Sequence, residues 1–106
     1  MKYYTLATLT VTDRAWTRDY VRDVTPMVER HGGRYLARTN QFERLEGEGD
    51  SPHLALLIEW PSREAALQFY ESEAYRPYRT ARLQGAQNEF YLVAGEDVNQ
   101  VARIEQ

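Results

Sequence analysis

The segment from His53 to Trp60 carries apolar side chains on both of its alternating faces. Leu54 and every second residue after it up to Trp60 are large and apolar, and the residues between them are apolar too, except for Glu59. A sheet that is covered on one side only has strands that alternate apolar with polar residues. We therefore expect a sheet that is covered on both sides.

Periodicity along the rest of the chain predicts the elements that accompany this strand. Strand patterns run over residues 2–11, 34–46 and 88–94, with a bulge expected in the middle of the second, and helical patterns run over residues 13–31, 62–70 and 73–86. At 106 residues the chain has room for one domain with one core. We place that domain at residues 1–95 and a polar tail at residues 96–106.

Short polar side chains predict where the helices begin. Asp13, Ser62 and Ser72 each precede a helical pattern and can accept hydrogen bonds from the free amides of a first turn. Two prolines fall inside these patterns. Pro26 predicts a kink or a break near residues 22–25, and Pro77 predicts an early interruption of the last helix.

The order of the elements is strand, helix, strand, strand, helix, strand. This order is that of the split βαβ arrangement, an α+β fold of ferredoxin-like type (βαββαβ) in which a four-stranded antiparallel sheet has its helices on one face. The other face is too apolar to be left in water. Two such sheets packed face to face would form a dimeric α+β barrel, so we expect a homodimer formed through the sheet face.

Composition excludes several function classes. The net charge is −3, from 13 basic and 16 acidic residues without a large basic cluster, so we expect no nucleic-acid partner. The absence of cysteine excludes disulfides and thiolate chemistry, and two distant histidines make a poor metal site, so we expect no metal and no cofactor. Without a secretory signal or a membrane-spanning run, we expect a cytoplasmic protein that does not insert into a membrane.

Glu59 is the first candidate for chemistry, because a carboxylate on a covered sheet face is costly unless it is paired. It is either a general base or ligand anchor inside the barrel, or the structural partner of Arg38 or Arg82. Arg38 could clamp a carboxylate or an enolate with two hydrogen bonds, or pair with Glu46 or Glu59.

Three further positions complete the candidate site. Tyr20 could point its hydroxyl into a pocket from the first helix, and packing in the core is the other interpretation of this residue and of Tyr75. Arg82 can pack its stem among apolar residues and reach an anionic group with its head. Glu46 lies near the expected bulge, where a pocket mouth or a solvated loop could form.

The chain carries, in order, Val11-Thr12-Asp13, Tyr20, Pro26, residues 29–38 (ERHGGRYLAR), Leu45-Glu46-Gly47, residues 58–62 (IEWPS), Ala65-Ala66 and residues 72–75 (SEAY) leading to Arg82. In this order and spacing it resembles the family known as domain of unknown function 1330. The resemblance implies the dimeric α+β barrel superfamily, which includes cofactor-free monooxygenases, lactone isomerases, haem enzymes and proteins without known activity. Such membership indicates the fold far better than the function.

These observations leave more than one function open. The first is a small-molecule-binding dimer, with Glu59, Arg38 and Tyr20 as candidate catalytic residues and Arg82, Tyr75 and Glu46 as candidate ligand-binding residues. A glutamate base and an arginine stabiliser would suit proton transfer or isomerisation beside a carbonyl. A cofactor-free monooxygenase and a non-catalytic structural or regulatory binding module are the alternatives.

Overall fold

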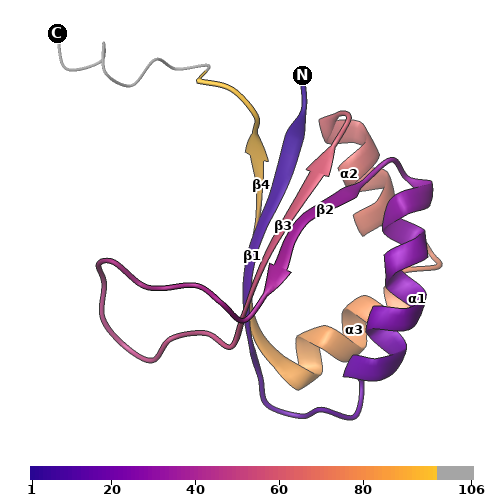
Figure 1. Ribbon diagram of the computed structural model, residues 1–106. Coiled ribbons are helices and arrows are strands. Elements are labelled where there is room, and N and C mark those ends of the chain that lie inside the picture. The colour runs from indigo at the N-terminus through magenta and orange to yellow at the C-terminus, as the bar shows by residue number, and fades with distance from the viewer. Residues whose placement is uncertain (98–106) are drawn as a thin grey trace, which may run out of the picture.

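Four antiparallel strands form one sheet, and the helices cover one of its faces (Figure 1). The structure is a computed structural model that describes residues 1–97. Its elements are β1 (Tyr3–Val11), α1 (Thr17–Arg30), β2 (Arg34–Thr39), β3 (Leu54–Trp60), α2 (Arg63–Tyr70), α3 (Arg76–Gly85) and β4 (Ala86–Ala94). The strand order β2-β3-β1-β4 confirms the predicted α+β, ferredoxin-like fold with a four-stranded antiparallel sheet. From residue 98 on, the expected polar tail lies outside the described residues.

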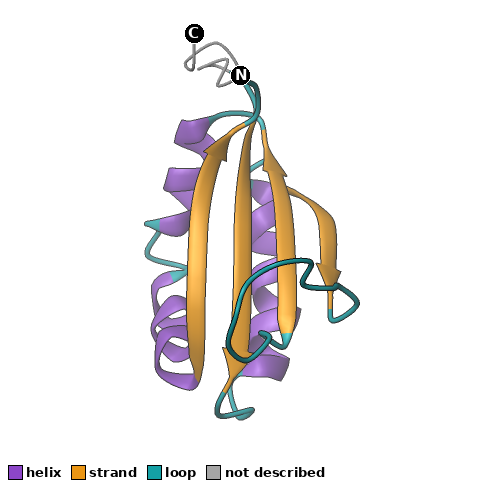
Figure 2. Ribbon diagram, turned by 90° about the vertical axis from the view of Figure 1, so that its left-hand side faces the viewer, coloured by secondary structure: helices purple, strands orange, loops and turns teal. Residues whose placement is uncertain are grey.

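The register of the strands sorts the side chains onto two faces. Leu6 pairs with Leu57 on β3 and with Tyr91 on β4, and all three lie on the face that carries no helix. The next residue, Ala7, is buried on the helix side. Figure 2 shows the face that carries no helix towards the viewer, with the helices behind the sheet. We call it the open face.

Aromatic rings fill much of the space between the sheet and the helices. The rings of Trp60 and Phe69 stack with centroids 5.4 Å apart, and Phe69 and Tyr75 follow at 4.3 Å. The indole nitrogen of Trp60 donates to the Thr5 hydroxyl at 2.9 Å, so this buried ring has its polar atom satisfied. The stack ties the third strand to α2 and to the turn before α3.

The second strand is shorter than predicted. It ends at Thr39, and residues 40–53 form an exposed loop that projects from the sheet on the side away from the helices (Figure 1). Gly47 and Gly49 have φ values of 119° and 91°, which a continuing strand does not allow. A bulge is present, but it falls between Tyr35 and Ala37 rather than in the middle of the predicted strand.

The first helix also begins later than predicted. Asp13 accepts from the backbone amide of Ala15 at 2.9 Å, so it caps a turn, and α1 starts only at Thr17 after Trp16. The expected break is wrong, because α1 is one continuous helix that contains Pro26. A helix tolerates an internal proline at the cost of one backbone hydrogen bond.

The starts of the other helices follow their polar side chains more closely. The Ser62 hydroxyl accepts from the amide of Ala65 at 3.1 Å, which confirms the predicted cap of α2. Ser72 accepts from the amide of Tyr75, but it caps a turn that leads into α3 at Arg76. Pro77 lies in the first turn of α3 and does not interrupt it, because the amide of a first-turn residue needs no helical partner.

Candidate functional site

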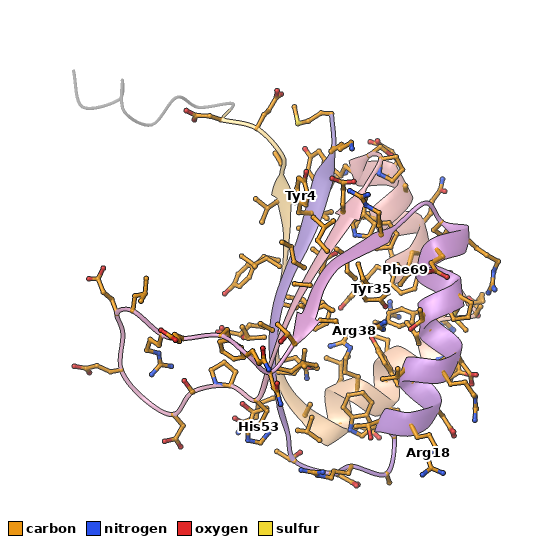
Figure 3. All side chains as sticks on the ribbon, viewed as in Figure 1. Tyr4, Arg18, Tyr35, Arg38, His53 and Phe69 are labelled. Atoms are coloured by element: carbon orange, nitrogen blue, oxygen red, sulfur yellow. The ribbon has the colours of Figure 1, made fainter. Side chains whose placement is uncertain are left out.

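A cavity of about 370 Å³ lies between the sheet and the helices. Its walls are mainly apolar, with aliphatic side chains from the helix side of β1 and β3. Arg38 on β2 and Phe69 on α2 both lie in this layer between the sheet and the helices (Figure 3). The aromatic residues of the lining are Trp16, Tyr20, Tyr35, Trp60, Phe69, Tyr70, Tyr75, Phe90 and the largely exposed Tyr91. A cavity of this size and lining suits a compact apolar or aromatic molecule.

Two tyrosines from different helical segments meet at this cavity. Tyr20 comes from α1 and Tyr75 from the turn before α3, and their hydroxyl oxygens are 2.5 Å apart. Burial, and next the neighbouring Tyr75, raise the pKa of the Tyr20 phenol far above its ordinary value. Tyr20 therefore stays protonated at neutral pH and acts as a hydrogen-bonding group, not as a base. Both candidate tyrosines line the cavity.

Arg82 is the buried charge of the site. Its side chain is only 1% exposed, it lines the cavity, and its guanidinium lies 4.0 Å above the Phe90 ring. Its Nε donates to the Tyr75 hydroxyl at 3.3 Å and its Nη1 to the side-chain oxygen of Asn88 at 2.9 Å. Within residues 1–97, its Nη2 is buried without a hydrogen-bond partner. Burial lowers the pKa of Arg82, but the neighbouring Tyr75, Tyr20 and Tyr70 together raise it by more, so the guanidinium keeps its charge.

Arg38 also lines the cavity, at a more exposed position on β2. Its guanidinium lies 3.9 Å above the ring of Tyr35 and donates from Nη1 to the Thr25 hydroxyl at 2.8 Å. The expected pairing of Arg38 with Glu46 or Glu59 is wrong. Arg38 thus links β2 to α1 beside the cavity.

Glu59 lies on the open face, on the side of the sheet opposite to the cavity. Its carboxylate forms ion pairs with Lys2 and Arg34, each at 3.3 Å, and accepts from the Tyr4 hydroxyl at 3.1 Å. The expected partners Arg38 and Arg82 are therefore wrong. β3 alternates its side chains between the faces, and Glu59 falls on the same face as Leu57.

The remaining candidate, Glu46, sits in the exposed loop between β2 and β3 and is not part of the cavity lining. The structure thus brings Tyr20, Tyr75, Arg82 and Arg38 to one cavity and leaves Glu59 and Glu46 outside it. Throughout residues 1–97, no group of three His, Asp or Glu side chains could hold a metal ion.

Sequence reasoning missed two contributors to this site. Asn88 donates from its amide to the backbone carbonyls of Ala86 and Arg82, which turns its side-chain oxygen towards the Arg82 guanidinium. Trp16 lines the cavity and donates from its indole to the carbonyl of Gly85 at 3.1 Å. The available signal for Asn88 was that it is the one polar residue among alternate positions of β4, with Ala86 before it and Phe90 and Leu92 after it. The available signal for Trp16 was its position four residues before Tyr20.

The family model of domain of unknown function 1330 (DUF1330) matches residues 2–96. The chain belongs to this family. No relative with a curated description matches the sequence of this DUF1330 protein.

Solved structures with the same fold include proteins with and without a known activity. A protein of unknown function from Rhodopseudomonas palustris, RPA0582, is 21% identical with a TM-score of 0.72, covering 91% of this chain and 83% of its own. SnoaB from Streptomyces nogalater, described as a cofactor-independent oxygenase, is 17% identical with a TM-score of 0.62, over 92% of this chain and 96% of its own.

An antibiotic biosynthesis monooxygenase is 14% identical with a TM-score of 0.57, covering 91% of this chain and 99% of its own. At these identities the likeness shows that the DUF1330 chain has the same fold as these proteins. It carries the activity of none of them to this chain.

Proposed function

We propose that this DUF1330 protein binds a compact, mainly apolar or aromatic molecule in the cavity between its sheet and its helices. The observation that supports the proposal is the cavity itself, a space of about 370 Å³ with a mostly aromatic and aliphatic wall and few polar groups. Protein interiors are normally packed without voids of this size, and an open space lined by large apolar side chains is costly to keep empty. A bound molecule would offset that cost.

The reaction that the structure supports least is proton transfer by Glu59, because that carboxylate lies on the other face of the sheet. The lining residues, all within the described part of the chain, include no Asp, Glu or His. The Tyr20 pKa is raised, which makes this phenol a poor base. If the protein is an enzyme, cofactor-free oxygenation of the bound molecule fits better than isomerisation by a protein base.

In that chemistry the substrate supplies the electrons. A CH₂ group and O₂ give a carbonyl group and water, so that the substrate carbon is oxidised and one oxygen atom leaves as water. The likeness in fold to a cofactor-independent oxygenase is what favours this candidate. Arg38 and Arg82 would stabilise negative charge on the substrate oxygen during the reaction. In the alternative, the protein is a non-catalytic binding module that holds the molecule in the same cavity and does not convert it.

We also propose that the protein is a homodimer that forms through the open face. Leu6 is 50% exposed, Tyr91 is 57% exposed and Val93 is 41% exposed on neighbouring positions of β1 and β4. Adjacent apolar side chains on one sheet face are typical of an interface. The same face of a second copy would cover them, and the loop of residues 40–53, which passes in front of this face in Figure 2, would lie beside the partner.

A cavity-filling substitution tests the binding proposal. Ala66 is buried in α2 and lines the cavity, whereas its neighbour Ala65 does not. We expect benzyl alcohol to shift the amide NMR signals of cavity residues in the wild-type protein and in Ala65→Leu, and to bind at least tenfold more weakly to Ala66→Leu. Equal binding to both variants, or no binding to the wild-type protein, would contradict the proposal.

Turnover is tested separately by measuring oxygen uptake with an oxygen electrode, in the presence of a metal chelator. We expect oxygen uptake with an electron-rich aromatic compound that binds the cavity, and loss of that uptake in Ala66→Leu. Compounds that bind without any uptake of oxygen would favour the non-catalytic module.

A further inference from the structure

Among residues 1–97, no acidic side chain forms an ion pair with the buried guanidinium of Arg82. Its hydrogen bonds go to two neutral side chains, Tyr75 and Asn88. A buried charge is costly unless an opposite charge or a full set of hydrogen bonds compensates it. Its Nη2, buried and unpartnered at the cavity, has neither.

The neighbouring tyrosines add a second unused donor. The Tyr20 and Tyr75 hydroxyls share one hydrogen bond, and Tyr75 also accepts from Arg82 Nε. Two hydroxyls carry two protons, and the bond between them uses only one. Whichever tyrosine donates to the other, one O–H remains without an acceptor among the contacts of the pair.

The cluster of Arg82, Tyr20, Tyr75 and Asn88 therefore has two unused donors, and its one formal charge is positive. Both amide hydrogens of Asn88 are used, since its nitrogen donates to two carbonyls, and its oxygen already accepts from Arg82. Such a cluster matches a group that only accepts and that carries negative charge. A carboxylate meets both needs, because one oxygen can face the guanidinium and the other a hydroxyl.

We infer that the cavity binds its molecule by a carboxylate, held by Arg82 Nη2 and by the free hydroxyl of the Tyr20–Tyr75 pair, with the apolar body of the ligand among the aromatic rings. This inference rests on the proposed cavity function and adds the charge of the ligand to it. The stacking of Arg82 on Phe90 and its bond to Asn88 hold the guanidinium in place before the ligand arrives. Because both polar contacts lie in a buried site, the anion is attracted more strongly than it would be at the surface.

Benzoate and benzyl alcohol test the inference, because they share the ring and differ in charge. Each is titrated into the wild-type protein, Arg82→Met, Tyr20→Phe and Arg76→Met, with binding followed by calorimetry and amide NMR. Arg76 is the matched control, since it lies on the same helix and pairs at the surface with Glu73. We expect benzoate to bind the wild-type protein and Arg76→Met at least tenfold more tightly than benzyl alcohol.

In Arg82→Met we expect benzoate to lose at least tenfold in affinity while benzyl alcohol changes less than threefold. Tyr20→Phe leaves the Tyr75 hydroxyl as a donor and should keep the preference, whereas the double variant Tyr20→Phe/Tyr75→Phe, titrated in the same way, should show a smaller loss for benzoate alone. Equal affinities of the two probes for the wild-type protein would overturn the inference and leave the cavity function in place. No binding of either probe would overturn both. If Arg82→Met does not fold, the double variant Tyr20→Phe/Tyr75→Phe decides, because it removes both hydroxyls. A smaller preference for benzoate in that variant supports the inference, and an unchanged preference overturns it.

Discussion

The hydroxyl oxygens of Tyr20 and Tyr75 lie 2.5 Å apart and join α1 to the turn before α3 at the wall of the cavity. The two rings also meet edge to face, with centroids 6.0 Å apart. This contact links two segments that are far apart in the chain. It is therefore both a part of the site and a part of the packing of the helices.

We expect Tyr20→Phe and Tyr75→Phe each to lower the free energy of unfolding by about 1 kcal/mol, because each leaves the other hydroxyl without its partner. The double variant should lose less than the sum of the two, which a double-mutant cycle in urea measures. Tyr3→Phe is the control and should leave the stability unchanged, because the Tyr3 hydroxyl has no hydrogen bond within residues 1–97. Strictly additive losses would show that the two hydroxyls are not coupled.

Gly85→Ala should destabilise the protein by about 1–3 kcal/mol, the usual cost of overpacking. An added Cβ would overlap the Cδ1 and Nε1 atoms of Trp16, whose indole donates a hydrogen bond to the Gly85 carbonyl. We expect a red shift of tryptophan fluorescence as Trp16 is displaced, together with a lower melting temperature. Gln84→Ala, at the exposed neighbouring position, should show neither change. An unchanged Gly85→Ala variant would contradict the packing described for Trp16.

Glu59→Gln should make the stability of the protein less dependent on pH in the acidic range. Burial raises the pKa of Glu59, but its bonds with Lys2 and Tyr4 and the charge of Arg34 lower it by more, to a net value below the ordinary 4.5. A lowered pKa in the folded state stabilises the protein fully above the ordinary pKa and ceases to do so as the pH falls through the folded value.

The melting temperature of the wild-type protein should therefore fall more steeply than that of Glu59→Gln between pH 6 and pH 3. Glu89→Gln, on the same face, should keep the wild-type dependence. Because Glu59 lies outside the cavity, Glu59→Gln should also bind benzyl alcohol like the wild-type protein. Weaker binding would return Glu59 to the candidate site, where the sequence analysis placed it as a catalytic residue.

Leu6→Arg should convert the protein into monomers. Leu6 lies in the centre of the open face, so an arginine there would be buried without a partner in the proposed dimer. Light scattering should give about 25 kDa for the wild-type protein, twice the 12.4 kDa of one chain, and half of that for the variant. Leu83→Arg is the matched control, since Leu83 is similarly exposed at 54% but lies on α3. A wild-type protein that is monomeric at micromolar concentrations would contradict the dimer.

Local patterns were enough to predict most of the secondary structure. Apolar residues on both faces of short segments identified β1, β3 and β4, and the order of the elements identified the ferredoxin-like fold. The prediction failed where an isolated pattern had no partner: residues 42–46 alternate like a strand, but β3 begins only at Leu54 and has no residue left to pair with them. A strand needs a neighbour to satisfy its backbone, and periodicity alone does not provide one.

The candidate site divides in the same way. The residue types were sufficient to single out Tyr20, Arg38, Tyr75 and Arg82, which do reach one cavity, because a tyrosine or an arginine among apolar helix or strand positions has to point inwards or fold back. Glu59 was assigned to the same site, and the alternation along β3 already placed it on the other face from Trp60. Which face the helices cover was the information that the pattern lacked.

The sequence by itself determined the fold, the faces of each strand and the small set of polar groups available for function, because these depend on residue type and on spacing along the chain. Tertiary structure alone decided which of those groups meet. The contact of Tyr20 with Tyr75 and the unpartnered Nη2 of Arg82 depend on how α1 and α3 pack over the sheet. The physical reason is that spacing specifies directions within one element, whereas distances between elements follow from the packing of all of them together.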